Sequence, residues 1–162
     1  MNDATMFLII CGALVLFMTP GLAFFYGGLV RASSVVSMMM MSFGSIGLIG
    51  ILWILYGYAI SFANAGTGNF VGLDGIAGID LSQIGLGALV SEHETSDGFQ
   101  LAFAGFQGTF AIITVALISG AIADRAKFGS WMIFAGLWAT IVYFPVAGWV
   151  FNFTLADGKV VD

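Results

Sequence analysis

The chain alternates between long apolar runs and short polar stretches, and each run is long enough to cross a lipid bilayer. A helix of about twenty apolar residues spans the roughly 30 Å hydrocarbon core of a membrane. Four runs reach that length: Ala4 to Val30, Val35 to Phe62, Phe99 to Ala123 and Phe128 to Phe153. We therefore predict four transmembrane helices.

The same runs argue against a membrane β-barrel and against a soluble domain. Barrel strands are roughly ten residues long with alternating polarity, whereas these runs are longer and apolar on all sides. The 162 residues are 60% hydrophobic and only 8% charged, and the mean hydropathy of +1.05 is typical of a membrane protein. We predict an all-α fold, a polytopic membrane helix bundle that forms one domain over residues 1–162.

Positively charged residues predict the orientation of the bundle. Arg31 follows the first run, and Arg125 and Lys127 lie between the third and fourth. Because Lys and Arg concentrate in cytoplasmic loops, both of these short connections are predicted to be cytoplasmic. The N-terminus and the connection from Ala63 to Gly98 then lie outside, in a multi-pass protein of the cell (plasma or inner) membrane.

The N-terminal run is predicted to stay in the protein as a membrane helix. Met1-Asn2-Asp3 has no basic region of the kind that opens a secretory signal, and the run that follows is too long for one. Cys11 is the only cysteine, so it forms no disulfide within the chain, and we interpret it as a small core residue.

The outer connection is acidic and rich in glycine. Its acidic residues either form a solvated surface or modestly enrich cations near an entrance, and they are Asp74, Asp80, Glu92, Glu94 and Asp97. A nucleotide-binding loop needs a preceding buried strand and a defined glycine spacing, which the sequence lacks here. Glu92-His93-Glu94 lacks the ligand spacing of zinc helices. We expect no metal, no cofactor and no nucleic-acid partner.

Local features add detail to the helices. Ser96, Asp97 and Gly98 precede the third run and are expected to supply an N-cap oxygen. Pro20 and Pro145 lie inside apolar runs, where proline removes a backbone donor and favours a kink. Small residues on the second and third runs predict close helix contacts, namely Gly44, Gly47, Gly50, Gly105 and Gly108.

The third run carries three phenylalanines and one amide on a single helix face. Phe103, Phe106, Gln107 and Phe110 stand at i, i+3, i+4 and i+7. Such a stripe is either a packing seam or the lining of a narrow path for something polar. Spacing alone does not decide between these two interpretations.

Three longer motifs resemble the ammonium transporter family (Amt/Mep/Rh). LFMTPGLAFFYGGLVR resembles the first helix of that family, FQGTFAIITVALISGAIADRAKF its third helix and the following turn, and YFPVAGWVF its fourth. The resemblance implies an eleven-helix homotrimer in which each subunit has a pore between two inverted five-helix repeats. This chain would then match the first repeat without its fifth helix and would lack the second repeat. The family's paired pore histidines would lie beyond its end, and His93 is not one of them.

The resemblance also implies roles for individual residues. Phe106 matches the aromatic residue beside an outer ammonium site, Phe110 the upper ring of a phenylalanine gate, and Gln107 the amide between them. An aromatic face stabilises a cation by roughly 0.5 to 2 kcal/mol, which is too little to offset full desolvation of an ion. We therefore expect the proton to leave before the hydrophobic passage, with no enzymatic chemistry.

Two positions near the implied outer site are an aromatic residue on the fourth run and an acidic residue at the end of the chain. Many members have His-Trp-Val-Trp on the fourth helix where this chain has Gly148-Trp149-Val150-Phe151, so Phe151 takes the place of the recruiting tryptophan. Trp149 is its rival, although it points roughly 200° away around the helix. Asp162 matches an acidic residue that opens the fifth helix, with either a capping role or direct cation contact.

The resemblance predicts transport of ammonium or methylammonium by a protein embedded in the lipid bilayer. Two alternatives stay open: an ammonium sensor coupled to a signalling domain, and a membrane scaffold whose aromatic stripe only packs. Members of the family are commonly regulated by cytoplasmic PII-type proteins, and the turn from Asp124 to Lys127 would lie near that surface.

Overall fold

A computed structural model describes residues 3–63, 70–73, 77–92 and 98–151. These ranges contain four helical spans that are long and apolar enough to cross a membrane. The first is α1 (Asp3–Leu29). The second, Ala32–Ser61, joins a 3-10 turn, α2 (Val35–Leu52), a π-helical turn (Trp53–Gly57) and α3 (Tyr58–Ser61).

The third and fourth spans complete the bundle. Phe99–Ile122 contains α5 (Phe99–Ile118) and a 3-10 turn, and Phe128–Phe151 contains α6 (Phe128–Trp138), a π-helical turn (Ala139–Tyr143) and α7 (Phe144–Phe151). All four spans begin and end within three residues of the predicted runs.

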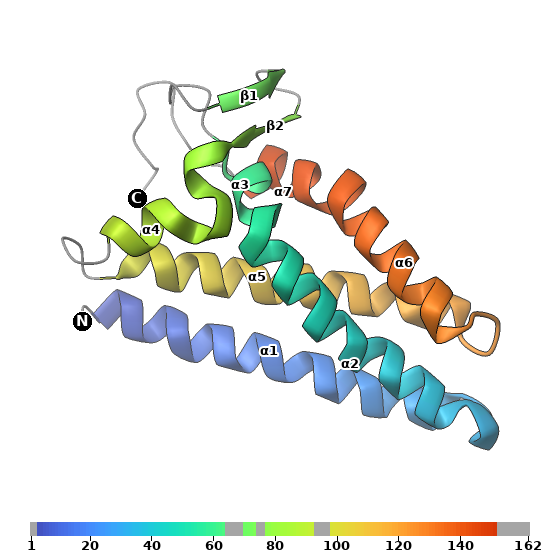
Figure 1. Cartoon of the computed structure of the whole chain (residues 1–162). Coiled ribbons are helices and arrows are strands. Elements are labelled where there is room, and N and C mark those ends of the chain that lie inside the picture. The colour runs from blue at the N-terminus through green and yellow to red at the C-terminus, as the bar shows by residue number, and fades with distance from the viewer. Residues whose placement is uncertain (1–2, 64–69, 74–76, 93–97, 152–162) are drawn as a thin grey trace.

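The helices run back and forth, so the connections gather at two opposite ends (Figure 1). The N-terminus, the hairpin and α4 lie at one end, and the α1–α2 and α5–α6 turns lie at the other. Helix α1 packs on α2 and α5, α2 also packs on α5 and α6, and α3 packs on α7. Arg31 and Arg125 therefore belong to turns at the same end of the bundle.

The connection between the second and third spans contains structure that the sequence analysis missed. Strands β1 (Phe70–Leu73) and β2 (Ala77–Asp80) form an antiparallel hairpin, followed by a 3-10 segment (Leu81–Leu86) and α4 (Gly87–Glu92). Apart from this hairpin, the described elements are helical, and the four membrane-length spans agree with the predicted all-α fold class.

The interpretation of Asp80 as part of an acidic surface is wrong. Asp80 is fully buried, and its carboxylate accepts hydrogen bonds from the Ser82 backbone N–H at 3.0 Å and the Ser82 hydroxyl at 2.6 Å. A buried carboxylate needs such partners. Asp80 therefore belongs neither to a solvated face nor to an electrostatic entrance, because it caps the segment that follows β2.

The start of the third span also differs from the prediction. Gly98 itself occupies the N-cap position of α5, in the left-handed conformation at φ 73°, with no side-chain capping bond. Glycine adopts this conformation without steric cost. The backbone of Gly98 still contributes, since its carbonyl accepts the Ala102 N–H at 3.0 Å. Ser96 and Asp97 lie outside the described residues.

Both prolines lie within helices, and only one is close to an irregular turn. Pro20 is inside the continuous helix α1, whereas Pro145 is the second residue of α7, two residues after the end of the π-helical turn Ala139–Tyr143. Thr140 Oγ1 in that turn donates to the Gly136 carbonyl at 2.8 Å and lies 2.8 Å from the Tyr56 hydroxyl, which therefore donates to it. Tyr56 belongs to the other π-helical turn, so this bond joins the two irregular turns.

The predicted close approaches at glycine are partly correct. A Cβ added at Gly44 would lie 2.9 Å from the Met132 sulfur, and one at Gly108 would lie 2.7 Å from Trp53 Cδ1. Both glycines therefore allow a side chain of another helix to come close. Among the described residues, Gly47 and Gly105 have nothing within 4 Å of such an atom, so neither makes a close contact there.

Gly57 makes a contact that leads to a stability prediction. A Cβ at this position would lie 2.7 Å from Cζ of the buried Phe144 ring. Because overpacking a buried ring costs about 1–3 kcal/mol, Gly57→Ala should lower the thermal unfolding midpoint of the detergent-solubilised protein. Gly47→Ala on the same span is the control, since alanine there meets open space and has the higher helix propensity. Equal midpoints for the two variants would contradict the described packing.

Candidate functional site

The most distinctive feature of α5 is a pair of phenylalanine rings on successive turns. The ring centroids of Phe106 and Phe110 are 5.0 Å apart and the ring planes are tilted by 82°, an edge-to-face arrangement. This geometry suits the quadrupole of aromatic rings. Both residues are only partly buried in this chain.

Phe103 belongs to a different set of contacts. Its ring meets Phe62 edge-on at 5.5 Å, and Phe62 in turn stacks on Tyr58 at 4.9 Å. The structure therefore divides the aromatic stripe. Phe103 is part of a packed aromatic cluster with α3, whereas Phe106 and Phe110 pair with each other.

Two amides lie on this face of α5, Gln100 and Gln107, and Gln107 is the one beside the ring pair. Gln107 is partly buried, and no residue in the described ranges forms a hydrogen bond with its side chain. Its neighbour on the face, Phe106, lies close to α1, because a Cβ added at Gly12 would lie 3.6 Å from Phe106 Cα. The ring pair and the amide therefore lie on an apolar helix that is tightly packed beside α1.

Trp53 holds α5 from another side. Its indole Nε1–H donates to the Ala104 carbonyl at 3.0 Å, and its ring lies against Gly108. The sequence analysis missed Trp53 although it marked Gly108 as a site of close approach. A glycine on a packed helix indicates a bulky neighbour, but only the three-dimensional arrangement identifies it.

Phe151 and Trp149 lie on different faces of α7. Phe144, Ala147, Gly148 and Phe151 stand at i, i+3, i+4 and i+7, and the first two are buried. This face meets α3: the Ser61 hydroxyl donates to the Phe144 carbonyl at 3.0 Å, and a Cβ at Gly148 would lie 2.8 Å from the Ser61 carbonyl oxygen. Phe151 is 36% exposed and Trp149 is 61% exposed.

Phe151 is not brought to the ring pair. Within the described part of the chain, Phe151 makes no ring contact with Phe106 or Phe110. Asp162, His93 and Glu94 lie outside the described residues. Among the residues that are described, no three His, Cys, Asp or Glu side chains form a group that could hold a metal ion.

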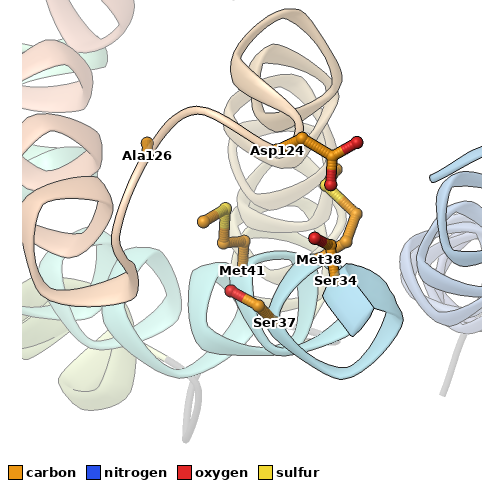
Figure 2. Close-up of a pocket in the computed structure, with 6 residues that line it drawn as sticks. All are labelled: Ser34, Ser37, Met38, Met41, Asp124 and Ala126. Carbon is orange, nitrogen blue, oxygen red and sulfur yellow. The ribbon is translucent and has the colours of Figure 1, made fainter. Parts of the chain in front are cut away.

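A small polar recess lies at the opposite end of the bundle, where the α5–α6 turn passes the start of α2 (Figure 2). Its volume is about 100 Å³, and its lining residues are Ser34, Ser37, Met38, Met41, Asp124 and Ala126. Asp124 adopts φ 61°, in the left-handed region that is uncommon for residues other than glycine. The recess is separate from the ring pair, since none of its lining residues belongs to α5.

Comparisons with known proteins identify relatives along almost the whole chain. A sequence model of the ammonium transporter family matches residues 6–161. An ammonium transporter of Mycobacterium tuberculosis is 51% identical over 92% of this chain and 33% of its own length. One of Bacillus subtilis is 43% identical over 91% of this chain and 35% of its own length.

Solved structures also resemble this chain over almost its whole length. Candida albicans Mep2 superposes with a TM-score of 0.71 at 28% identity, over 94% of this chain and 32% of its own. Saccharomyces cerevisiae Mep2 has the same TM-score at 34% identity, also over 94% of this chain and 32% of its own. The chain thus spans about a third of the length of these relatives. With four membrane-length helices in the predicted order and a family match over nearly all residues, this chain belongs to the ammonium transporter family.

Proposed function

We propose that the protein carrying this chain transports ammonium or methylammonium across a membrane and that the chain supplies part of the transport path. The observation that carries the proposal is the Phe106–Phe110 ring pair, with Gln107 beside it, on a membrane-length helix without charged residues. Family membership supports the substrate, because the relatives from M. tuberculosis and B. subtilis are named ammonium transporters.

The proposed mechanism follows from the chemistry of the ring pair. An ammonium ion that loses water gains roughly 0.5–2 kcal/mol from each aromatic face it meets. The edge-to-face pair then presents apolar carbon to the ion, and a constriction of this kind excludes hydrated cations. Because burial of an unpaired charge costs far more than the rings return, the ion gives its proton to water on the outer side, and neutral ammonia or methylamine then passes Phe110.

Phe151 is the proposed aromatic residue of the outer site. It shares a face of α7 with the buried residues Phe144 and Ala147, whereas Trp149 lies roughly 200° away around the helix. This placement favours Phe151 over Trp149 as an inward-facing ring. Asp162 is proposed beside it as the acidic residue that either caps a helix or contacts the cation.

A homotrimer in the plasma or inner membrane is the proposed assembly. Helix α1 has exposed large apolar side chains along its length, such as Phe7, Phe17 and Phe24, which suit contact with lipid or another subunit. A PII-type regulator is the proposed cytoplasmic partner. It would meet the end of the bundle that contains the turn from Asp124 to Lys127.

The proposed orientation has the N-terminus outside, and thiol labelling tests it. In a background of the full-length protein from which Cys11 and any other native cysteine have been removed, Lys127→Cys should react with a membrane-impermeant reagent only after the cytoplasmic side is opened. Val71→Cys in β1 is the matched outer position, because Val71 is exposed and β1 lies at the other end of the bundle. Labelling of Lys127→Cys in intact cells would reverse the orientation.

Transport itself is tested by uptake of labelled methylammonium into cells that lack their own ammonium transporters. Expression of the full-length protein should produce saturable uptake that unlabelled ammonium competes with. Uptake equal to that of cells with an empty vector, at verified membrane expression, would refute the proposed function.

A further inference from the structure

We propose that Trp53 is a positioning residue that fixes α5 so that Phe106 and Phe110 line the transport path. This inference rests on the proposed function. It assigns a role to a residue of the second span that does not belong to the ring pair. Its evidence is a hydrogen bond, a close packing contact and the position of both relative to the rings.

Trp53 contacts α5 at two points that are one helical turn apart. The indole Nε1–H donates to the Ala104 carbonyl at 3.0 Å. The same side of the indole lies against Gly108, where an added Cβ would be 2.7 Å from Cδ1 and 2.9 Å from Nε1. The bond limits sliding of α5 along Trp53, and the contact limits its rotation.

The two contact points, Ala104 and Gly108, are close in sequence to the residues of the proposed path. Phe106 and Gln107 stand between them, and Phe110 follows Gly108 by two residues. At about 100° per residue, each ring lies roughly 200° around the helix from the nearer contact point. Trp53 therefore holds the back of α5, and any rotation of the helix at Ala104 and Gly108 carries both rings with it.

Trp53 is itself held rigidly. Its side chain is only 3% exposed. The residue begins the π-helical turn Trp53–Gly57, and the Tyr58 N–H after this turn donates to the Trp53 carbonyl. Its ring meets Phe144 of α7 edge-on at 5.7 Å and Tyr58 at 6.0 Å. Turns of this type are frequent at functional sites, and here the turn places a rigid donor between two neighbouring helices.

The chain contains a matched control for this residue. Trp131 on α6 is 1% exposed and also donates its indole N–H to a backbone carbonyl of another helix, that of Met41, at 3.1 Å. Met41 belongs to the half of α2 near the polar recess, and Trp131 does not contact α5 through this bond. Trp53→Phe and Trp131→Phe thus remove the same kind of bond at two places, and only one of these is beside the ring pair.

The test measures the ratio of methylammonium uptake to potassium uptake by proteoliposomes that contain the full-length protein. This ratio does not depend on how much protein has folded, so general destabilisation does not change it. Since displacement of an oriented group by about 1 Å can change a rate up to about a hundredfold, we expect Trp53→Phe to lower the ratio by about tenfold. Trp131→Phe should leave it unchanged. Equal ratios for the two variants would overturn the proposal.

A second pair of variants changes the α5 side of the contact between Trp53 and Gly108. Gly108→Ala should push against the indole and lower the ratio in the same direction as Trp53→Phe. Gly105→Ala is the control, because nothing lies within 4 Å of its added Cβ. A Gly108→Ala protein with the wild-type ratio would contradict the role of this contact.

The positioning role and the proposed function can fail separately. If the wild-type protein takes up no methylammonium, the proposed function is wrong, and structures of the full-length variants still test the positioning. The Phe106 and Phe110 rings should be displaced in Trp53→Phe and unmoved in Trp131→Phe. Rings that stay in place in both variants would refute the positioning role whatever the uptake.

Discussion

Replacing Phe110 with alanine in the full-length protein is expected to let hydrated cations through while ammonium still passes. Phe110 and Phe106 form an edge-to-face pair at 5.0 Å, and removal of one ring opens the apolar constriction. Potassium uptake should therefore rise while methylammonium uptake persists, so the ratio of methylammonium to potassium uptake should fall. The measurement is this uptake ratio in proteoliposomes.

Phe103→Ala is the matched control for this prediction. Phe103 lies on the same helix face, but its ring packs against Phe62 at 5.5 Å. Loss of a packed ring costs stability, with about 3–5 kcal/mol for a fully buried phenylalanine as the upper limit, because Phe103 is only partly buried. Phe103→Ala should therefore lower the unfolding temperature and leave the ratio of methylammonium to potassium uptake unchanged. Small and equal shifts of that ratio in both variants would mean that all the phenylalanines of the stripe only pack.

Replacing Phe151 with tryptophan is expected to strengthen ammonium capture. Tryptophan is the better cation partner, and the gain is bounded by roughly 1–2 kcal/mol, or about tenfold or somewhat more in affinity. Phe151→Ala should weaken capture, and Trp149→Ala should leave it unchanged, since Trp149 lies on another face of α7. Concentration-dependent methylammonium uptake measures all three. If only Trp149→Ala weakens capture, the outer aromatic residue is Trp149.

The helical spans were predictable because they follow from one physical requirement. A helix that crosses hydrocarbon must be apolar over about twenty residues, and runs of that length are visible in the sequence. The observed spans therefore agree with the prediction to within three residues. The hairpin was not predictable in the same way, because β1 and β2 have only four residues each and lie in a glycine-rich connection without alternating polarity.

The candidate site was predictable only in part. Spacing puts Phe103, Phe106 and Phe110 on one face, but it cannot separate a packed ring from a paired one. That difference depends on Phe62, which directly follows the end of another helical span. Trp53 was missed for the same reason, since its partners Ala104 and Gly108 are brought to it only by helix packing. Asp80 was misread because its capping bonds depend on the local turn at Ser82.

The most direct test of the central claim is a structure of the full-length protein determined with and without methylammonium. The account predicts added density over the face of the Phe106 ring, within about 6 Å of its centroid, on the side of α5 that carries Gln107 and Phe110. Density at another position, with Phe106 and Phe110 packed against lipid or protein and no path beside them, would contradict it.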